Sequence, residues 1–590
     1  MLRIIRKKFS HHVKLSHFSG PKDINLLNHT IGEVFHHTIT KYGSHEGFIS
    51  VHQNKRFTWE EVNVKVDQLA KAIISLGLEP QSRIGIVAPN CYEWFISQYA
   101  IAQAGMILVN INPSYQEKDL KYCLNKVKVN SLIMPTTMKT THFLHILRDI
   151  SPDLYHKIQD PRNLKLSELP SLKQIILLDN TSTGEAENHK HYLTHVKENH
   201  LISYEEFTEE YSKKCTDEEY KKRQHFIKPD HPANIQFTSG TTGLPKGAIL
   251  SHYNIINNGF CVGNTIKYKA KDRILITVPM YHCFGTVLGS LAAITKGSTV
   301  IYSSPIFDPK KVLETVEKEK VSSLYGVPTM FLQILKHQEE MKKDIKSLRT
   351  GVMAGSICPK YLMDRVINEL GLLNLTNCYG MTELSPVTHQ TRMIDSVEKK
   401  TKTVGINIAH TETKIVDKEG KIVPIGTKGE ICSKGFGVMI GYWEDEQATK
   451  DCIDKDGYMK TGDIGHFDEE GYLTIDGRSK DTIIRGGENI SPREIEEFLI
   501  THPCVEDVHC FAVKDEKYGD EICIWVKKKP GMELDKREIQ HFCKGQLAHF
   551  KVPKYVRLVD SFPMTITGKV QKYIMRDISN KILEEKSEEM

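Results

Sequence analysis

Short apolar runs alternate with longer helical patterns in the first part of the chain, and this alternation limits the possible folds more than any other feature. Residues 83–90 (RIGIVAPN) and 106–113 (MILVNINP) have the length and apolar content of buried strands. A helical pattern begins near Thr58, and a second one covers 91–105. Strands that alternate with helices are typical of parallel sheets covered by helices. The alternation returns over 321–370, so the sequence predicts an α/β fold with substantial parallel sheet.

The pattern then changes twice along the chain. From about residue 404 short strands and turns dominate, which indicates a β-rich subdomain. Beyond Gly477 the order is helix, strand, strand and helix over roughly 110 residues, a plausible size for a small α/β domain. A chain of 590 residues is also too long for one hydrophobic core. We expect a large N-terminal domain of α/β layers with the β-rich subdomain over 30–479, and a small C-terminal α/β domain over 481–580.

The first 22 residues differ from the rest of the chain. No acidic residue occurs before Asp23. The cations of this segment are Arg3, Arg6, Lys7, Lys8, Lys14 and Lys22. If the segment is helical, one face holds Leu2, Ile5, Phe9 and Val13. A basic, amphipathic, acid-free start is typical of a mitochondrial transit peptide, with an unstructured basic tail as the alternative. We therefore expect residues 1–22 to be a transit peptide and the protein to reside in the mitochondrial matrix.

Composition argues against several other classes of protein. The net charge is +5 and no dense basic block occurs in the body of the chain, so nothing points to a nucleic-acid partner. The 13 cysteines are odd in number and never form a CxxC pair, which argues against a disulfide framework or a zinc ribbon. No apolar run approaches the roughly 18 residues of a membrane span. The oligomeric state stays open.

The stretch QFTSGTTGLPKGAILSH, residues 236–252, combines glycines, hydroxyl residues and a lysine between two strand-like runs. Glycines let backbone amides approach a ligand closely, and hydroxyls add donors for phosphate oxygens. The spacing is not that of a Walker-type loop, because Lys246 is followed by Gly247 instead of a serine or threonine. The flanking runs indicate a hairpin. The loop alone leaves two alternatives open, phosphate binding and a plain glycine turn.

Three further segments carry groups that suit a nucleotide and Mg²⁺. In NCYGMTE, Tyr379 can stack on a purine, Thr382 can reach a phosphate and Glu383 can hold a hard cation. Asp463 lies in a turn after a strand, where a carboxylate can accept ribose hydroxyls, and Arg478 follows it closely. Each residue alone is more often an ordinary solvated side chain. Together they provide every group needed to bind a nucleotide.

From about residue 30 to 575 the chain resembles the adenylate-forming (AMP-binding) superfamily of acyl-CoA synthetases, firefly luciferase and peptide-synthetase adenylation domains. The motifs that carry the resemblance, in the order of the family, are TSGTTGLPKG, VPMYHCFG, AGSICP, YGMTE, GEICSKGFGVMIGYW, TGD, GRSKDTIIRGGENISPREIE and MTITGK. Several long motifs in one order make a chance resemblance negligible. The sequence is most similar to the mitochondrial acyl-CoA synthetase family member 2 group in three segments, IQFTSGTTGLPKGAILSHYNIINN, LYGVPTMF and HFKVPKY.

The resemblance implies a set of ATP-binding residues. These are Thr238, Ser239, Gly240, Thr241, Thr242, Gly243, Lys246, Gly355, Ser356, Tyr379, Asp463 and Arg478. The loop members would enclose the β- and γ-phosphates and then pyrophosphate. Gly355, Ser356 and Tyr379 would frame the adenine, although Cys358 stands in a variable stretch and leaves the adenine contacts open. Asp463 and Arg478 would bind the ribose.

The resemblance also implies catalytic roles for four residues, Lys569, Thr382, Glu383 and His282. A carboxylate must approach the α-phosphorus of ATP, so two anions are forced together, and a positioned cation with Mg²⁺ offsets that repulsion. Lys569 would be this cation. Thr382 would touch the α-phosphate and Glu383 the Mg²⁺, while His282 would form a gate between nucleotide and acyl pocket.

The second half-reaction needs a different geometry, because a thiol must attack the acyl-adenylate while AMP leaves. Family members rotate the C-terminal domain between the two steps, so the resemblance implies a mobile domain. The hinge aligns with Lys480, and the rotation would bring the segment with Gly487 to a tunnel for coenzyme A.

The resemblance implies an ATP-dependent fatty acid–CoA ligase that acts on medium-chain acids, with small-molecule substrates (fatty acid, ATP, coenzyme A) and Mg²⁺. The acyl pocket would come from the segments around Asn257, Tyr325–Thr329 and Gly355. The alternatives are an adenylating ligase for another carboxylic acid (aryl, branched or amino acid), luciferase-like oxidation, a P-loop switch, and a non-catalytic nucleotide- or lipid-binding protein. The spacing of the glycine-rich loop, which is not that of a Walker motif, counts against a P-loop switch. The presence of Lys569 and Glu383 counts against a non-catalytic binding protein.

Overall fold

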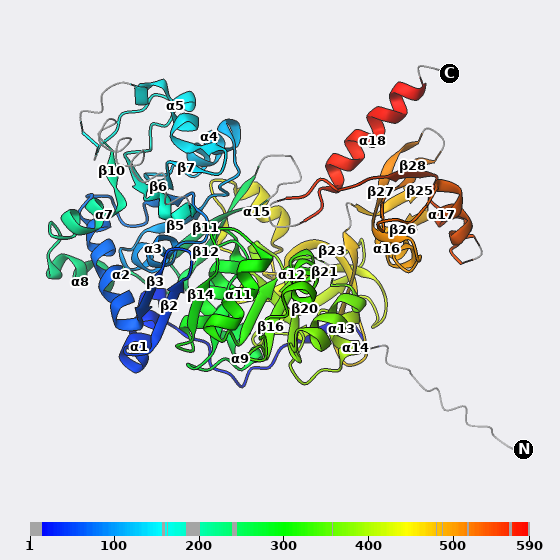
Figure 1. Cartoon of the computed structure of the whole chain (residues 1–590), viewed down its shortest axis with the longest axis horizontal. Helices are drawn as coiled ribbons and strands as arrows, with labels where there is room; N and C mark the ends of the chain where they lie inside the picture. The colour runs from blue at the N-terminus through cyan, green and yellow to red at the C-terminus, as the bar shows by residue number, and fades with distance from the viewer. Residues whose placement is uncertain are drawn as a thin grey trace, which may run out of the picture. The chain divides into compact units, whose positions relative to one another are not determined.

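A computed structural model of the chain describes most of its length (Figure 1). The described residues are 14–155, 160–161, 163–184, 201–238, 245–356, 358–478, 481–485, 488–515, 518–544, 546–565 and 569–587. The chain divides into two compact units. Unit 1 comprises Met1–Ser19, Glu412–Ser433 and Lys460–Met590, and unit 2 comprises Gly20–Thr411 and Lys434–Met459. The strands expected beyond residue 404 thus belong mainly to the same unit as the C-terminal segment.

Unit 2 is built on two large sheets. The first has the order β10 (Ile202–Ser203), β9 (Gln174–Leu178), β6 (Ser131–Pro135), β4 (Arg83–Ile86), β5 (Ile107–Asn110), β11 (Pro232–Thr238), β12 (Lys246–Ser251), β22 (Gly441–Tyr442). It is parallel from β10 to β11, and β12 is antiparallel to both β11 and β22. The second has the order β19 (Ile406–Asn407), β18 (Val387–Gln390), β17 (Asn374–Gly380), β16 (Thr350–Ala354), β15 (Ser323–Gly326), β13 (Arg273–Leu275), β14 (Thr299–Tyr302), β2 (Glu46–Ser50), β3 (Lys55–Thr58). Its strands from β17 to β2 are parallel, so the α/β prediction is confirmed.

Helices cover both faces of each sheet. The central layer between the sheets contains α1 (Ile31–Tyr42), α2 (Trp59–Ile74), α3 (Tyr92–Gln103), α9 (His252–Ile266) and η5 (Phe284–Leu291). The outer face of the first sheet packs against α4 (Glu117–Lys126) and α5 (Phe143–Ile150). The outer face of the second packs against α11 (Pro309–Glu319), α12 (Pro328–Met341) and α13 (Lys360–Glu369). Only Tyr92 of α3 is not buried, as expected for a helix enclosed on all sides.

The local sequence explains where the predicted helices begin. Thr58 caps α2: its hydroxyl accepts a hydrogen bond from the backbone N–H of Glu61, whose side chain accepts one from the N–H of Thr58. This reciprocal pair satisfies two backbone donors that the helix itself leaves free. The helix predicted from Thr58 is therefore confirmed, as is the one over 91–105.

Unit 1 contains two smaller sheets. One has the order β1 (His17–Ser19), β20 (Thr411–Val416), β21 (Gly429–Gly435), β23 (Met459–Phe467), β24 (Leu473–Arg478). The other has the order β26 (Glu488–Ile490), β25 (Ile483–Arg485), β28 (Gly519–Lys528), β27 (Val505–Asp515), with β29 (Tyr555–Leu558) beside β28. Alternate residues of β27 and β28 face α16 (Pro492–Leu499) and α17 (Lys536–Cys543) on one side and α18 (Lys572–Ser587) on the other. The predicted order of helix, strand, strand and helix is present as α16, β27, β28 and α17.

Strand β1 comes from the segment expected to be a leader. It pairs antiparallel with β20, and the buried Ser16 just before it donates its hydroxyl to the carbonyl of Pro424 at 2.9 Å. Within β1, the ring of Phe18 lies 4.8 Å from that of Phe467. Residues 1–13, with the expected apolar helix face, lie outside the described residues. The described part of the 22-residue segment is thus an edge strand of a folded sheet.

The stretch 181–225 is polar in sequence, yet its described part contributes side chains to the core. Tyr204 and Phe207 are buried in the central core of unit 2. Helix α8 (Asp217–Phe226) adds the buried Tyr220, whose hydroxyl donates to Asp67 of α2 at 2.7 Å. Scattered aromatics therefore anchor a segment whose composition is otherwise polar.

None of the helices among the described residues has both the length and the apolar character needed to cross a membrane.

Candidate active site

The glycine-rich loop joins two paired strands, as the sequence predicted. Strands β11 and β12 form an antiparallel hairpin whose last register pair is Thr238 with Lys246. The loop residues Ser239, Gly240, Thr241, Thr242 and Gly243 lie outside the described residues. The structure thus fixes the two ends of the loop, Thr238 and Lys246.

Glu383 is the point where three distant segments of unit 2 meet. It lies in the short 3-10 turn η6 (Thr382–Leu384) after β17, and it is 5% exposed. Its Oε1 accepts a hydrogen bond from the hydroxyl of Thr238 and another from that of Tyr442, both at 2.9 Å. The backbone N–H of Met439 donates to the Glu383 carbonyl at 2.9 Å. Two hydroxyl donors on one oxygen stabilise the charged carboxylate inside the protein.

Lys246 shares a partner with Glu383. Its ammonium lies 5.0 Å from the ring centroid of Tyr442, a cation–π distance. Burial and the negative charge of Glu383 raise the pKa of Tyr442 well above its usual range. The tyrosine therefore stays protonated and can donate to the carboxylate. Sequence reasoning assigned no role to Tyr442, although it stands in the GEICSKGFGVMIGYW motif; its signal was an aromatic with a hydroxyl directly after a glycine.

His282 and Thr382 approach each other through a cysteine. The Nδ1 atom of His282 accepts a hydrogen bond from the N–H of Phe284 at 3.1 Å. The sulfur of Cys283 lies 3.6 Å from this Nδ1 and 3.7 Å from the hydroxyl of Thr382. Cys283, which sequence reasoning also missed, is buried. The structure thus brings together Thr382, Glu383, His282, Thr238 and Lys246 within unit 2.

The residues predicted to frame the adenine lie at the carboxyl ends of two neighbouring parallel strands, β16 and β17. Gly355 and Ser356 follow β16 and are exposed, and Tyr379 is the second-last residue of β17, opposite His389 of β18. Gly355 has a φ of +90°, and a Cβ there would lie 3.1 Å from a methyl of Val327. A glycine is therefore required at this position. Carboxyl ends of parallel strands are where ligands bind in open α/β sheets, which suits the predicted adenine site.

Asp463 and Arg478 form a cross-strand pair in unit 1. They lie opposite each other on β23 and β24, with the Arg478 Nε donating to Asp463 Oδ1 at 3.0 Å. Asp463 is buried, whereas about half of the Arg478 side chain is exposed. The register of the two strands thus explains why the two residues predicted to bind one ribose lie together.

Lys569 belongs to unit 1 and is exposed. Its backbone N–H donates to the hydroxyl of Thr565 at 3.0 Å, and its carbonyl accepts from the N–H of Thr565 at 2.7 Å. The lysine therefore lies directly beside the bridge between Met564 and Val570. Lys480 and Gly487, the predicted hinge and coenzyme A residues, lie outside the described residues.

The segments expected to form the acyl pocket are mostly interior. The amide of Asn257 accepts from the N–H of Leu27 at 2.7 Å and donates to its carbonyl at 2.9 Å, so it anchors the N-terminal segment of unit 2. Tyr325 is fully buried and donates its hydroxyl to the carbonyl of Leu288 at 2.7 Å. Phe284 lies 5.7 Å from the Tyr325 ring. These contacts describe packed side chains in the interior of unit 2.

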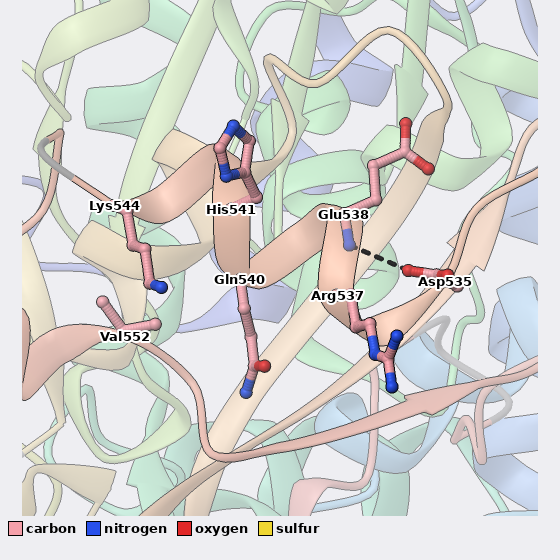
Figure 2. Close-up of a pocket in the computed structure, with 7 residues that line it drawn as sticks. All are labelled: Asp535, Arg537, Glu538, Gln540, His541, Lys544 and Val552. Carbon is pink, nitrogen blue, oxygen red and sulfur yellow. Dashed lines mark hydrogen bonds between the residues drawn. The ribbon is translucent and has the colours of Figure 1, made fainter.

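A groove is present on the C-terminal part of unit 1, but it does not match the predicted site (Figure 2). Its volume is about 720 Å³. Its lining residues are Asp535, Arg537, Glu538, Gln540, His541, Lys544 and Val552, mostly from α17. No residue predicted to bind nucleotide is among them, and the charges of both signs favour no single ligand.

The residues around Glu383 suit one kind of cation. Among the described parts of the chain there is no cluster of three or more histidine, cysteine or carboxylate side chains that could hold a metal on its own. Mg²⁺ in nucleotide sites is commonly held by one or two carboxylates together with phosphate oxygens and water. A single buried glutamate bonded to Thr238, at one end of the predicted phosphate loop, fits that pattern.

Comparison with known proteins agrees with this geometry. A model of AMP-binding enzymes matches residues 35–443, and a model of the C-terminal domain of AMP-binding enzymes matches 494–569. Human mitochondrial medium-chain acyl-CoA ligase ACSF2 is 39% identical over 568 residues, which cover 95% of this chain and 89% of the relative. The putative acyl-CoA synthetase YngI of Bacillus subtilis is 40% identical over 555 residues (94% and 97%).

Solved structures share the fold. The anthranilate CoA ligase AuaEII in complex with anthranoyl-AMP has a TM-score of 0.78 at 21% identity, over 95% of this chain and 99% of that one. MatB from Rhodopseudomonas palustris with bound ATP has a TM-score of 0.75 at 22% identity, over 93% and 99%. The resemblance inferred from the motifs is confirmed: the chain belongs to the adenylate-forming superfamily of AMP-binding enzymes, and within it is a ligase of the acyl-CoA synthetase type.

Proposed function

We propose that this protein is an ATP-dependent fatty acid–CoA ligase that acts on medium-chain acids and produces acyl-CoA, AMP and pyrophosphate. The observation that carries the proposal is the meeting of Thr238, Tyr442 and Lys246 around the buried Glu383, at the base of the glycine-rich loop. The medium-chain preference is supported by relatives that carry that name at 39% identity.

In the first half-reaction the fatty acid carboxylate attacks the α-phosphorus of ATP and pyrophosphate leaves. The loop between Thr238 and Lys246 encloses the β- and γ-phosphates, and Thr382 contacts the α-phosphate. Glu383 would hold Mg²⁺, which would supply positive charge that reduces the repulsion between the carboxylate and the phosphates. Lys569 supplies a second cation at the reacting oxygens.

Three further groups orient the nucleotide and separate it from the acid. Asp463 and Arg478 bind the ribose hydroxyls, and their ion pair fixes the direction of both side chains before ATP arrives. Tyr379 stacks on the adenine beside Gly355 and Ser356. His282 stands at the entrance of the acyl pocket.

In the second half-reaction the thiol of coenzyme A attacks the acyl-adenylate carbonyl and AMP leaves. The proposed hinge at Lys480 turns the C-terminal domain between the steps, so that Lys569 withdraws and the segment with Gly487 lines the path of coenzyme A. AMP is a good leaving group, whereas a free carboxylate is a poor acyl donor, which is why adenylation comes first.

The test is acid-dependent pyrophosphate release across a chain-length series of fatty acids and one aryl acid, with and without coenzyme A. We expect release to peak at medium-chain acids and thioester to appear only with coenzyme A. Peak release with the aryl acid would replace the fatty acid assignment, and absence of release with every acid would overturn the ligase proposal.

We also propose import into the mitochondrial matrix, supported by the basic N-terminal segment and by the mitochondrial relatives. A bacterial relative matches 94% of the chain, so similarity over the enzyme domains does not by itself indicate a mitochondrial location. Deletion of residues 1–13 is the appropriate test, because it leaves β1 intact. The shortened, tagged protein is expected in the cytosol; continued import would overturn the targeting proposal.

A further inference from the structure

Two opposite charges of the candidate site contact one aromatic side chain. Glu383 Oε1 accepts the Tyr442 hydroxyl at 2.9 Å, and the Lys246 ammonium lies 5.0 Å from the centre of the same ring. Glu383 is the proposed metal carboxylate and Lys246 ends the proposed phosphate loop. We propose that Tyr442 is a positioning residue that holds these two charges apart and aims each at its own part of Mg·ATP. This inference rests on the proposed function and extends it to a residue with no assigned role.

Strand register explains how one side chain reaches both charges. Strand β22 pairs antiparallel with β12, and Tyr442 lies opposite Ala248. Lys246 is two residues before Ala248 on the same strand, so it shares the face of Ala248 and is a diagonal neighbour of Tyr442. Thr238 lies opposite Lys246 at the other stem of the loop. The sheet therefore sets the tyrosine beside both ends of the loop.

The backbone around Tyr442 is itself held in place. The N–H of Tyr442 donates to the hydroxyl of Thr449 at 2.9 Å. Thr449 belongs to α15 (Glu446–Cys452), which begins at the capping residue Asp445. Gly441 has a φ of +156°, and a Cβ there would lie 3.1 Å from the Thr449 side chain. A fixed backbone leaves the tyrosine little freedom to follow Glu383 if that carboxylate moves.

Both hydroxyl donors end on the same carboxylate oxygen. Thr238 and Tyr442 each bond Oε1 of Glu383, so the carboxylate is oriented with Oε2 as its other ligand atom. A carboxylate fixed in this way meets a cation with one oxygen, which suits Mg²⁺ and its demand for near-octahedral geometry. Without the tyrosine hydroxyl, Oε1 keeps one donor and the carboxylate can rotate.

The aromatic ring of Tyr442 also keeps the Lys246 ammonium and the Glu383 carboxylate apart. An ammonium and a carboxylate that contact one side chain will pair directly if that side chain is removed, because opposite charges attract strongly in a poorly solvated site. A direct pair between Lys246 and Glu383 would withdraw the lysine from phosphate and the carboxylate from Mg²⁺ at once. The hydroxyl and the ring thus have separable effects.

Two variants separate these effects, and calorimetric titration with ATP is the measurement, once with Mg²⁺ and once with EDTA. Tyr442→Phe keeps the ring and removes the hydroxyl; we expect affinity for Mg·ATP to fall about tenfold, the usual worth of a hydrogen bond to a charged group, with little change for metal-free ATP. Tyr442→Leu removes both, and we expect affinity to fall for both forms of ATP. Binding of Mg·ATP by Tyr442→Phe within twofold of the wild-type value would overturn the proposal.

The matched control is Tyr458→Phe in the same unit. Tyr458 is buried and has the Lys434 ammonium 5.4 Å from its ring centre, but it is not a partner of Glu383. This variant should bind Mg·ATP as the wild type does; an equal loss in both tyrosine variants would assign the effect to general loosening and overturn the positioning role. Unfolding midpoints identify any variant that fails to fold. If the wild type binds Mg·ATP but activates no acid, the ligase proposal fails while the titrations still decide the role of Tyr442.

Discussion

Single side chains acquire their proposed roles here from the positions that the fold gives them. Lys569 is one exposed lysine among many in the sequence, and only the turn at Thr565 and the match of TITGK to the family distinguish it. Glu383, in contrast, is distinguished by its surroundings, since it is a buried carboxylate whose Oε1 accepts hydrogen bonds from two hydroxyls on distant segments. The sequence supplied the identity of both residues, and the structure supplies a physical reason for only the second.

Replacement of Lys569 by alanine is expected to affect one half-reaction only. Adenylation should fall by about a hundredfold or more, because a charge that stabilises the transition state is lost. Thioester formation from supplied acyl-AMP should be largely spared. The matched control is Lys581→Ala on the exposed face of α18, which should change neither step. Equal losses in both half-reactions of the Lys569 variant would contradict the two-step use of the C-terminal domain.

Replacement of Asp463 by asparagine is expected to weaken ATP binding more than catalysis. The amide keeps the size of the carboxylate but loses the ion pair with Arg478 and one acceptor for the ribose hydroxyls. KM for ATP should rise about tenfold while kcat changes little. Steady-state kinetics measure this change. In the neighbouring strand, Asp476→Asn removes an ion pair with His466 and Lys428 and should lower stability without changing KM; the same KM effect in both variants would assign it to the sheet and not to ribose binding.

Elements with a local signature could be predicted from the sequence, and those defined by distant partners could not. Helix α2 was predictable because the capping pair Thr58 and Glu61 lies at its N-terminus. The β11–β12 hairpin was predictable because its two strands flank a single loop. The pairing of β22 with β12 was not, since two residues carry no periodicity and the partner lies about 190 residues away. The meeting of Thr238 with Glu383, 145 residues apart, was hidden for the same reason.

Strand β1 lies within the segment whose composition predicts a leader, and its place in a sheet could not be predicted from that composition. The segment is basic and free of acids, which indicates a leader, yet its last residues complete a sheet edge. Ser16 and Phe18 contact the folded chain: Ser16 is buried, and Phe18 packs on Phe467. The composition of a segment shows its charge, but it does not show with which distant strand the segment pairs.

Two N-terminal deletions are expected to differ sharply in stability. Removal of residues 1–13 should leave the unfolding midpoint unchanged, because β1 and its hydrogen bonds remain. Removal of residues 1–22 deletes β1, the buried Ser16 and the packing of the half-buried Phe18 on Phe467, so the midpoint should fall. Thermal unfolding of the two proteins measures the difference. Equal midpoints would contradict a structural role for β1.

Unit 2 as a whole contains titratable groups whose pKa values are shifted by burial. Burial lowers the pKa of His52 to about 4 and those of His252 and His389 to about 3, so all three are neutral in the folded protein. Burial raises the pKa of Glu93 to about 7. In the unfolded chain histidine titrates near pH 6.5 and glutamate near 4.3. The folded and unfolded states therefore bind different numbers of protons between these values.

The signs of the two contributions are opposite. Between about pH 4 and pH 6.5 the unfolded chain binds three more protons at the histidines, so their contribution to stability decreases as pH falls. Between about pH 4.3 and pH 7 the folded protein binds one more proton at Glu93, so the contribution of that group increases as pH falls. Near pH 5.5 the net difference from these four groups approaches two protons, a slope of about 2.7 kcal/mol per pH unit.

Replacement of Glu93 by glutamine is expected to make the free energy of unfolding decrease more steeply as the pH falls. The amide oxygen can still accept the hydrogen bond that Gln53 donates to Glu93 at 2.9 Å, so packing is kept while the proton uptake of the folded state is removed. Below about pH 6.5 the slope should increase by up to about 1.4 kcal/mol per pH unit, because only the three histidines then contribute among these groups. Urea unfolding of both proteins from about pH 5 to pH 7 measures the difference, in which contributions from the other groups cancel. A variant with the same slope as the wild type would show that Glu93 is ionised in the folded protein.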